Sequence, residues 1–139
     1  MNNSNPVSAR TQLQIPFHDV DMMRVAWHGH YLKYFEIARG ELLDKIQYNY
    51  REMVESGYMW PVIDMRVKFI QPVTFGMTIN IDATLVEYEN RMKIEYLISD
   101  QDSGKRLTKG YTIQVAVDAE SGEMCLVSPT AFVSKVTQA

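Results

Sequence analysis

Apolar and polar residues alternate with a period of two in four long segments of the second half of the chain. This period is typical of strands that bury one face, and turn-forming residues separate the segments. The sequence therefore predicts an antiparallel meander of four strands after Trp60. Its apolar positions are Met65, Val67 and Phe69, then Ile79, Ile81, Ala83 and Leu85, then Met92, Ile94, Tyr96 and Ile98, and finally Tyr111, Ile113, Val115 and Val117.

The first half of the chain changes to a helical period. Apolar residues recur at every third or fourth position from Tyr31 to Ile46. This spacing predicts an amphipathic helix over roughly 29–46. A second helical piece is expected over 50–55, with Gly57 as its stop.

Short elements are expected at both ends. Before the long helix, Leu13, Ile15 and Phe17 alternate with Gln residues and Pro16. This pattern predicts a short strand, and the proline places it at a sheet edge. Residues 129–136 are expected to form either a short terminal helix or a last extended piece.

The order of one strand, one long helix and four strands predicts an α+β fold. The long helix carries aromatic residues on its apolar stripe, so we expect an antiparallel sheet of about five strands to curl around it. A flexible N-terminal tail is expected over 1–10, which is rich in Asn and Ser. Residues 11–139 are expected to form a single domain.

Composition narrows the class of protein. The chain has 139 residues, of which 46% are hydrophobic and 22% charged, with a net charge of −3. It is too short for a TIM barrel and lacks the overall basic character of a nucleic-acid binder. We find no secretory signal and no apolar run long enough to span a membrane. One cysteine, Cys125, fits a reducing compartment, so we expect a cytoplasmic protein.

Polar residues with catalytic potential gather between the first strand and the long helix. All three histidines of the chain are here, with two aspartates: His18, Asp19, Asp21, His28 and His30. Such residues commonly cap or neutralise a helix start. Here they also precede a helix N-terminus, whose unpaired N–H groups can polarise a carbonyl.

Two other uses of this cluster fit less well. A metal site is disfavoured, because His28 and His30 diverge at a helix start and no HExxH or EF-hand pattern is present. An aspartyl-phosphate enzyme with Asp19 as nucleophile would need alternating βα units, which the strand-rich second half does not offer. We therefore expect neither a metal nor a cofactor.

The segment from Phe17 to Glu36 resembles the signature of the 4-hydroxybenzoyl-CoA thioesterase family, whose members are hotdog-fold acyl-CoA thioesterases. The residues that carry the resemblance are Asp19, Asp21, Val25, Trp27, His28, Tyr31 and Glu36. A second stretch, from Val67 to Gly76, resembles the family's strand with its Pro and aromatic-Gly turn. The likeness extends over roughly 13–133 and implies a hotdog fold.

The resemblance also implies roles for individual residues. Asp21 is expected to be the catalytic carboxylate, as nucleophile or as general base for water. The backbone N–H of His28 is expected to polarise the thioester carbonyl. The remaining predicted site residues either line the acyl site, as Trp27, Met22 and Met59, or order the pocket or the helix, as Tyr31 and Glu36.

The substrate expected from the resemblance is an acyl-CoA or an acyl-carrier-protein thioester. We expect a homodimer or homotetramer and no nucleic-acid or membrane partner. A hotdog dehydratase or hydratase that uses Asp21 and His28 as an acid–base pair stays open, as does a non-catalytic module that binds acyl thioesters. The cations Lys105, Arg106 and Lys109, with Arg91 and Lys93, either contact a phosphate group or form solvated strand edges.

Overall fold

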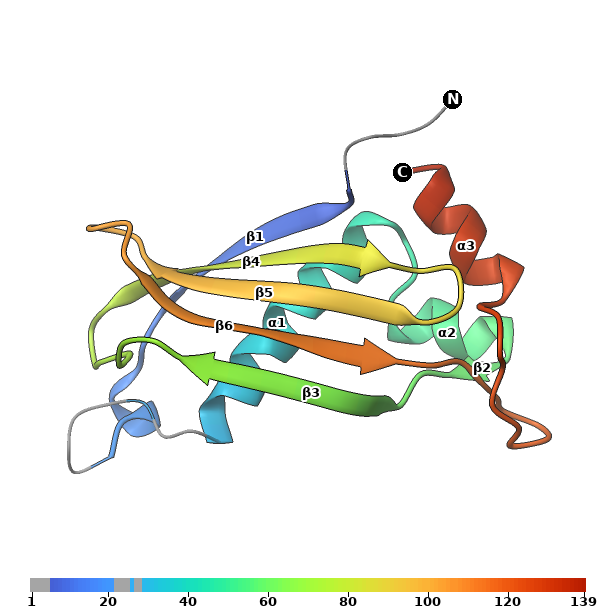
Figure 1. The fold of residues 1–139 in the computed structure, drawn as a ribbon, viewed down its shortest axis with the longest axis horizontal. Coiled ribbons are helices and arrows are strands. Elements are labelled where there is room, and N and C mark those ends of the chain that lie inside the picture. Colours follow the sequence, from blue (N-terminus) through green and yellow to red (C-terminus); the bar gives the residue numbers. More distant parts are fainter. Residues whose placement is uncertain (1–5, 22–25, 27–28) are drawn as a thin grey trace.

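The computed structural model describes residues 6–21, 26 and 29–139. A five-stranded antiparallel sheet lies against one long helix, α1 (Gly29–Lys45), which crosses one of its faces (Figure 1). The strand order is β1 (Ser8–Gln14), β4 (Thr78–Glu87), β5 (Met92–Asp100), β6 (Arg106–Gln114) and β3 (Val62–Phe69). The predicted α+β class and the sheet around one long helix are confirmed.

The remaining elements gather mostly at one end. A 3-10 turn, η1 (Phe17–Asp19), precedes α1. At the right-hand end of Figure 1 lie α2 (Tyr50–Ser56), α3 (Thr130–Thr137) and the strand β2 (Tyr58–Met59), which pairs with β7 (Val117–Asp118). The terminal segment predicted over 129–136 is thus helical from Thr130, with Pro129 as its N-cap. Within the described ranges, no helix is both long and apolar enough to cross a membrane.

The helix boundaries follow local sequence signals. Helix α1 ends one residue before the predicted boundary. The Asn49 side chain caps the start of α2 by accepting a hydrogen bond from the Tyr50 backbone N–H. The backbone N–H of Asn49 in turn donates to Glu52 Oε1 at 2.8 Å. Gly57 ends α2 with a φ of 89°, a left-handed conformation that glycine adopts without strain.

The predicted meander is correct for three strands and wrong for the fourth. Strands β4, β5 and β6 are successive neighbours, but β3 pairs with β6 at the far edge of the sheet. Alternation identified these segments as strands, whereas strand order depends on long-range pairing that the period does not encode.

The first strand lies at an edge, as predicted, but its bounds differ. It begins at Ser8, inside the predicted 1–10 tail, and ends at Gln14. Phe17 is not in the strand but in η1, where it is 74% exposed. Pro16 cannot donate a ladder hydrogen bond, which is consistent with the strand ending before it.

Strand β6 was predicted with the wrong face toward α1, although Ile113 and Val115 of the predicted set are buried. Thr108, Thr112 and Gln114 are buried, and they lie on the same face as Gly110. A Cβ added at Gly110 would overlap the Arg66 carbonyl oxygen and lie 3.0 Å from the Phe35 ring. This face therefore packs against α1. Because its residues are small or polar, the apolar alternation becomes visible only from Tyr111, and the strand's start at Arg106 was not predicted.

Aromatic residues fill the space between sheet and helix. Phe35 of α1 stacks on Tyr96 of β5 with ring centroids 4.3 Å apart. At the other end of the core, Phe132 of α3 packs against Trp60 and Tyr48 at 4.9 and 5.5 Å. Gly110 permits the close approach of Phe35 to the sheet, so the position of α1 depends on it.

Candidate functional site

Asp19 is a buried carboxylate that ties η1 to the first turns of α1. Its side chain is 1% exposed. Lys33 Nζ donates to both carboxylate oxygens at 2.8 Å, and the Tyr34 hydroxyl donates to Oδ2 at 2.9 Å. His18 Nε2 and His30 Nδ1 lie 3.5 and 3.8 Å from Oδ1. These contacts make Asp19 a structural anchor and argue against a nucleophilic role.

The surroundings of Asp19 fix its charge. Burial alone would raise the pKa of Asp19, but the hydrogen bonds from Lys33 and Tyr34 and the Lys33 charge outweigh it and lower the pKa. Burial, together with the bond to Asp19, raises the pKa of the Tyr34 hydroxyl. At neutral pH, Asp19 is therefore ionised and Tyr34 protonated.

Asp21 lies two residues further along and is exposed. Val20 forms a bridge with Ala26, whose amide donates to the Val73 carbonyl at 2.6 Å. Ala26 is thereby held against Val73 of the β3–β4 connection, and Val20 is held against Ala26. A second carboxylate thus stands at the surface, close in sequence to one that is bonded to the start of α1.

Three predicted site residues, Met22, Trp27 and His28, lie outside the described residues. The acyl-lining roles of Met22 and Trp27 and the carbonyl-polarising role of the His28 amide stay predictions.

Tyr31 and Glu36 both lie on α1 but in different surroundings. Tyr31 is 3% exposed, and burial raises the pKa of its hydroxyl. Its ring lies 4.8 Å from that of Phe69, at the end of β3. Glu36 is exposed, further along the helix. The structure therefore brings Tyr31 close to the Asp19 anchor and leaves Glu36 at the surface.

Met59 lies on a cavity of about 560 Å³ at the opposite end of the molecule. We call it the apolar cavity. It is bounded by α1, α2 and the segment from Tyr58 to Pro61, and most of its lining is apolar or aromatic, including Leu43, Met53, Val54, Tyr58 and Trp60. Its size and lining are typical of small-molecule sites.

Two polar residues of the apolar cavity were missed by the sequence reasoning. Gln114 is 5% exposed; its Nε2 donates to the Trp60 carbonyl at 2.7 Å, while its Oε1 has no partner among the described residues. Arg39 Nη1 is likewise buried without a partner there. A bound polar group or water would supply the missing hydrogen-bond partner of Gln114 Oε1 and of Arg39 Nη1. The only sequence signal is a glutamine within a strand, which alternation had assigned to the outer face.

Strand β3 separates this cavity from Asp21. Phe69, at its end, contacts the Tyr31 ring, whereas Met59 and Trp60 lie two or three residues before its start at Val62. Eight strand residues span about 26 Å. In a single chain, Asp21 and the apolar cavity therefore lie toward opposite ends of the strand.

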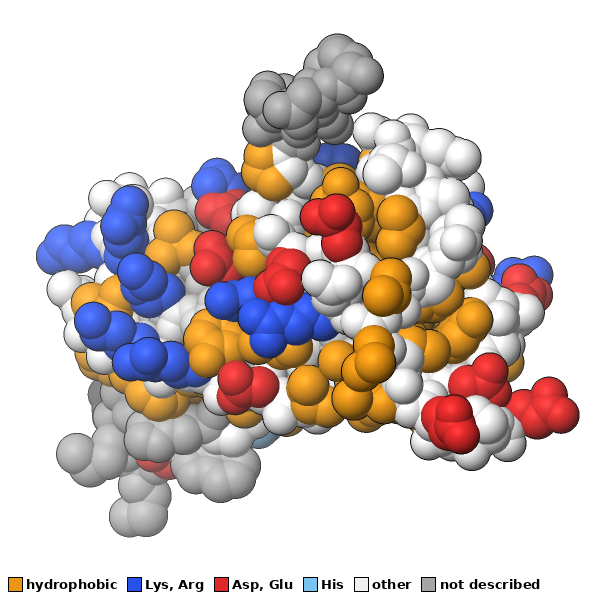
Figure 2. All heavy atoms as spheres, turned by 45° about the vertical axis from the view of Figure 1, so that its right-hand side comes forward, with side chains coloured by type: hydrophobic (Ala, Val, Ile, Leu, Met, Phe, Trp, Pro, Cys, Tyr) orange, Lys and Arg blue, Asp and Glu red, His pale blue; other side chains and the backbone are white. Residues whose placement is uncertain are grey.

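The same strand is an uncovered edge. Met65, Val67 and Phe69 pair with the inward-facing residues of β6, so they also face the helix side. Nevertheless Met65 and Phe69 are 41% and 46% exposed, and the flanking Ile63 and Ile70 are 56% and 43% exposed. Figure 2 shows hydrophobic side chains gathered along the lower part of the molecule, where β3 lies in Figure 1. An apolar edge of this kind is suited to pairing with another strand.

Metal ligands do not cluster in the part of the chain that the structure describes. Within these ranges, no group of three or more His, Cys, Asp or Glu side chains is placed to hold a metal ion.

Comparison with known proteins identifies the family. A sequence model of the thioesterase-like superfamily matches residues 15–136. A Bacillus subtilis (strain 168) protein named "Putative acyl-CoA thioesterase YneP" is 21% identical over 113 residues, which are 81% of this chain and 82% of that protein.

Solved structures have the same fold. A 1,4-dihydroxy-2-naphthoyl-CoA thioesterase from Synechocystis superposes with a TM-score of 0.81 at 16% identity, covering 94% of this chain and 96% of that one. A mutant 4-hydroxybenzoyl CoA thioesterase complexed with 4-hydroxybenzoyl CoA also gives 0.81, at 15% identity, covering 94% and 99%. These likenesses confirm the predicted hotdog fold. The match over most of its length shows that the chain belongs to the thioesterase-like superfamily.

Proposed function

We propose that this protein hydrolyses an acyl-CoA thioester to a carboxylic acid and CoA, with Asp21 as the catalytic carboxylate. The observation that carries the proposal is the environment of the neighbouring carboxylate. Asp19 is buried and accepts hydrogen bonds from Lys33 and Tyr34, which suits a structural role, and the family resemblance assigns catalysis to the second acid, the exposed Asp21. An acyl-CoA substrate is supported by the names of the similar proteins.

The chemistry needs one carboxylate and one hydrogen-bond donor. Asp21 either attacks the thioester carbon, forming an anhydride that water then hydrolyses, or removes a proton from a water that attacks the carbon directly. In both routes the carbon–sulfur bond breaks, and the CoA thiolate leaves and takes up a proton. The His28 backbone N–H, immediately before α1, would stabilise the negative charge that develops on the carbonyl oxygen.

A free thiol at Cys125 is compatible with the cytoplasmic location expected from the sequence.

Two copies would complete the site by pairing through β3. Antiparallel pairing about a twofold axis covers the exposed apolar edge of both chains. It also sets the Phe69 end of one β3 against the Val62 end of the other. Asp21 of one copy then faces the region of Met59 and Trp60 on its partner, so each active site uses both chains.

In this arrangement, the apolar cavity receives the acyl group. Met53, Met59 and Trp60 supply an apolar wall, and methionine adapts to groups of different shape. Arg39 and Gln114 supply the polar atoms that would complete their hydrogen bonds with a ligand group or a water.

The test is thiol release from a panel of short, long and aromatic acyl-CoA esters. Asp21→Asn should lower the rate at least about 100-fold, a typical loss for a positioned catalytic group, with fold and assembly unchanged. Asp102→Asn, in an exposed turn, is the matched control and should retain full activity. Near-normal turnover by Asp21→Asn would remove that residue from its role. Release from acyl-carrier-protein thioesters alone would assign the other substrate class.

A further inference from the structure

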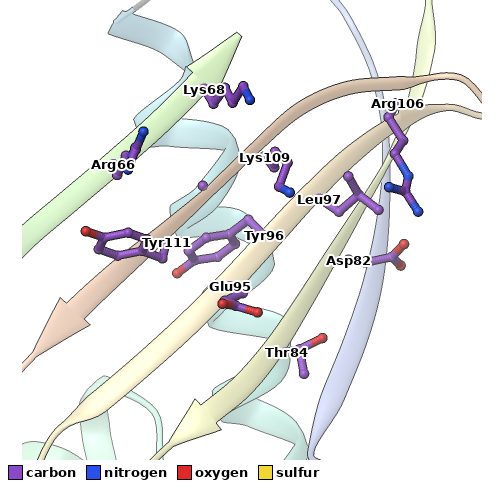
Figure 3. A pocket seen from close by; sticks show the side chains of 11 residues that line it. Arg66, Lys68, Asp82, Thr84, Glu95, Tyr96, Leu97, Arg106, Lys109 and Tyr111 are labelled. Atoms are coloured by element: carbon purple, nitrogen blue, oxygen red, sulfur yellow. The ribbon is translucent and has the colours of Figure 1, made fainter. Parts of the chain in front are cut away.

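Four cations surround a hollow of about 570 Å³ on the face of the sheet that points away from α1. We call it the basic hollow. Arg66 and Lys68 come from β3, and Arg106 and Lys109 from β6 (Figure 3). Lys68 and Lys109 are direct cross-strand partners, as are Arg66 and Tyr111. Figure 2 shows Lys and Arg side chains gathered at the left-hand end of the molecule.

The like charges of this arrangement destabilise the folded sheet. Like charges directly opposite each other on neighbouring strands destabilise a sheet. In the described part of the chain, none of the four cations forms an ion pair. Asp82, which also lines the hollow, is already held by Arg10 at 2.6 and 2.9 Å. The cations therefore have capacity for an anion from outside.

The lining is suited to a phosphorylated nucleotide. Figure 3 shows Lys68, Lys109 and Arg106 along one side of the hollow and Glu95, Thr84 and Asp82 along the other. Phosphate groups would lie on the cationic side. Leu97 offers apolar surface for a base, whereas Lys93 Nζ already lies over one face of the Tyr111 ring, 4.6 Å from its centre.

The hollow also lies toward the same end of the sheet as the start of α1. Lys68 precedes Phe69, whose ring contacts Tyr31 in the first turn of α1. The amides of Ile70 and Gln71 bond to the Leu107 carbonyl, beside Arg106. A ligand that rounds this end of the sheet would connect the start of α1 with the basic hollow.

We infer that the basic hollow binds the 3′-phosphorylated ADP portion of the CoA thioester. The inference rests on the proposed function, because it assumes that the thioester end of the same molecule lies at Asp21. The flexible pantetheine arm would pass around the end of β3. An acyl carrier protein carries the arm on a phosphodiester without the adenosine 3′-phosphate, so it would not present this nucleotide to the hollow.

Kinetics with matched substrates test the inference. The same acyl group is supplied on CoA, on 3′-dephospho-CoA and on pantetheine to the wild type, Lys109→Gln and Arg106→Gln. In the variants, KM for acyl-CoA should rise about tenfold, with kcat and the acyl-pantetheine reaction unchanged. Arg51→Gln removes a cation on α2, outside the hollow, and should leave all KM values as they are. An equal rise with acyl-pantetheine would overturn the inference.

Calorimetric titration with adenosine 3′,5′-bisphosphate separates this inference from the proposed function, because it needs no turnover. The wild type should bind the nucleotide, and Lys109→Gln should bind it at least about fivefold more weakly. Such binding supports the hollow even if no thioester is cleaved. Equal binding by both proteins overturns it, even if hydrolysis proceeds.

Discussion

Asp19 and Asp21 are separated by one residue but differ in burial. The Asp19 carboxylate accepts three hydrogen bonds from Lys33 and Tyr34, whereas Asp21 is exposed. Local sequence could place both aspartates between a strand and a helix. It could not divide their roles, because Lys33 and Tyr34 reach Asp19 only after α1 has docked.

The Asp19 anchor should make stability depend on pH in a specific range. Its pKa is lowered in the folded state, so its contribution is complete above the unfolded pKa of about 3.9 and is lost as the pH falls through the folded pKa. Asp19→Asn should cost about 2 kcal/mol at pH 7. Denaturant unfolding of both proteins should show this difference shrinking below pH 4. A constant difference down to pH 2.5 would contradict the assignment.

The helices and most strands were predictable because each has a strong local signal. Helix α1 carries its apolar stripe through its whole length, and α2 has an Asn cap and a Gly stop. Strand β6 has a misleading signal: its apolar residues alternate from Tyr111 on the outer face, whereas its inner face includes Thr108, Gly110 and Gln114. These residues face inward because Gly110 leaves room for the Phe35 ring and Gln114 lines the apolar cavity. Both are tertiary contacts, which the local sequence does not reveal.

Gly110 gives a test of this packing at the level of the elements. Gly110→Ala should destabilise the protein by about 2 kcal/mol, because the new methyl group overlaps the Arg66 carbonyl and crowds Phe35. Gly40→Ala is the control. It lies inside α1 with only Asn49 Nδ2 at 4.0 Å, so alanine should stabilise the helix by about 0.5–1 kcal/mol. Chemical denaturation measures both, and equal effects would contradict the packing argument.

At the scale of the whole molecule, the exposed edge of β3 predicts a dimer. Met65→Lys places a charge on its helix-side face and should convert the protein to a monomer with little loss of fold, because Met65 is 41% exposed. Val86→Lys, at a 44% exposed position of β4, should leave the assembly intact. Light scattering after gel filtration checks both. A Met65→Lys protein that stays dimeric would place the interface elsewhere.

A shared active site makes a further prediction for mixed dimers. Asp21→Asn removes the proposed catalytic group, and Met59→Arg obstructs the apolar cavity, so each variant alone should be inactive. When chains are exchanged at equal concentration, half of the dimers are mixed and each has one intact site. Activity should therefore return to about a quarter of the wild-type value. No recovery after verified exchange would mean that each chain uses its own cavity.

The uneven distribution of charge affects the rate at which the protein associates with its substrate. With a net charge of −3, the chain as a whole repels an anionic CoA ester. The cations of β3 and β6 stand at one end of the sheet, whereas Asp118, Glu120 and Glu123 belong to the β7 turn near the other. Such an electric dipole would turn an approaching polyanion toward the cationic end before any contact forms. Association should then slow steeply as ionic strength rises, while the rate of dissociation changes much less.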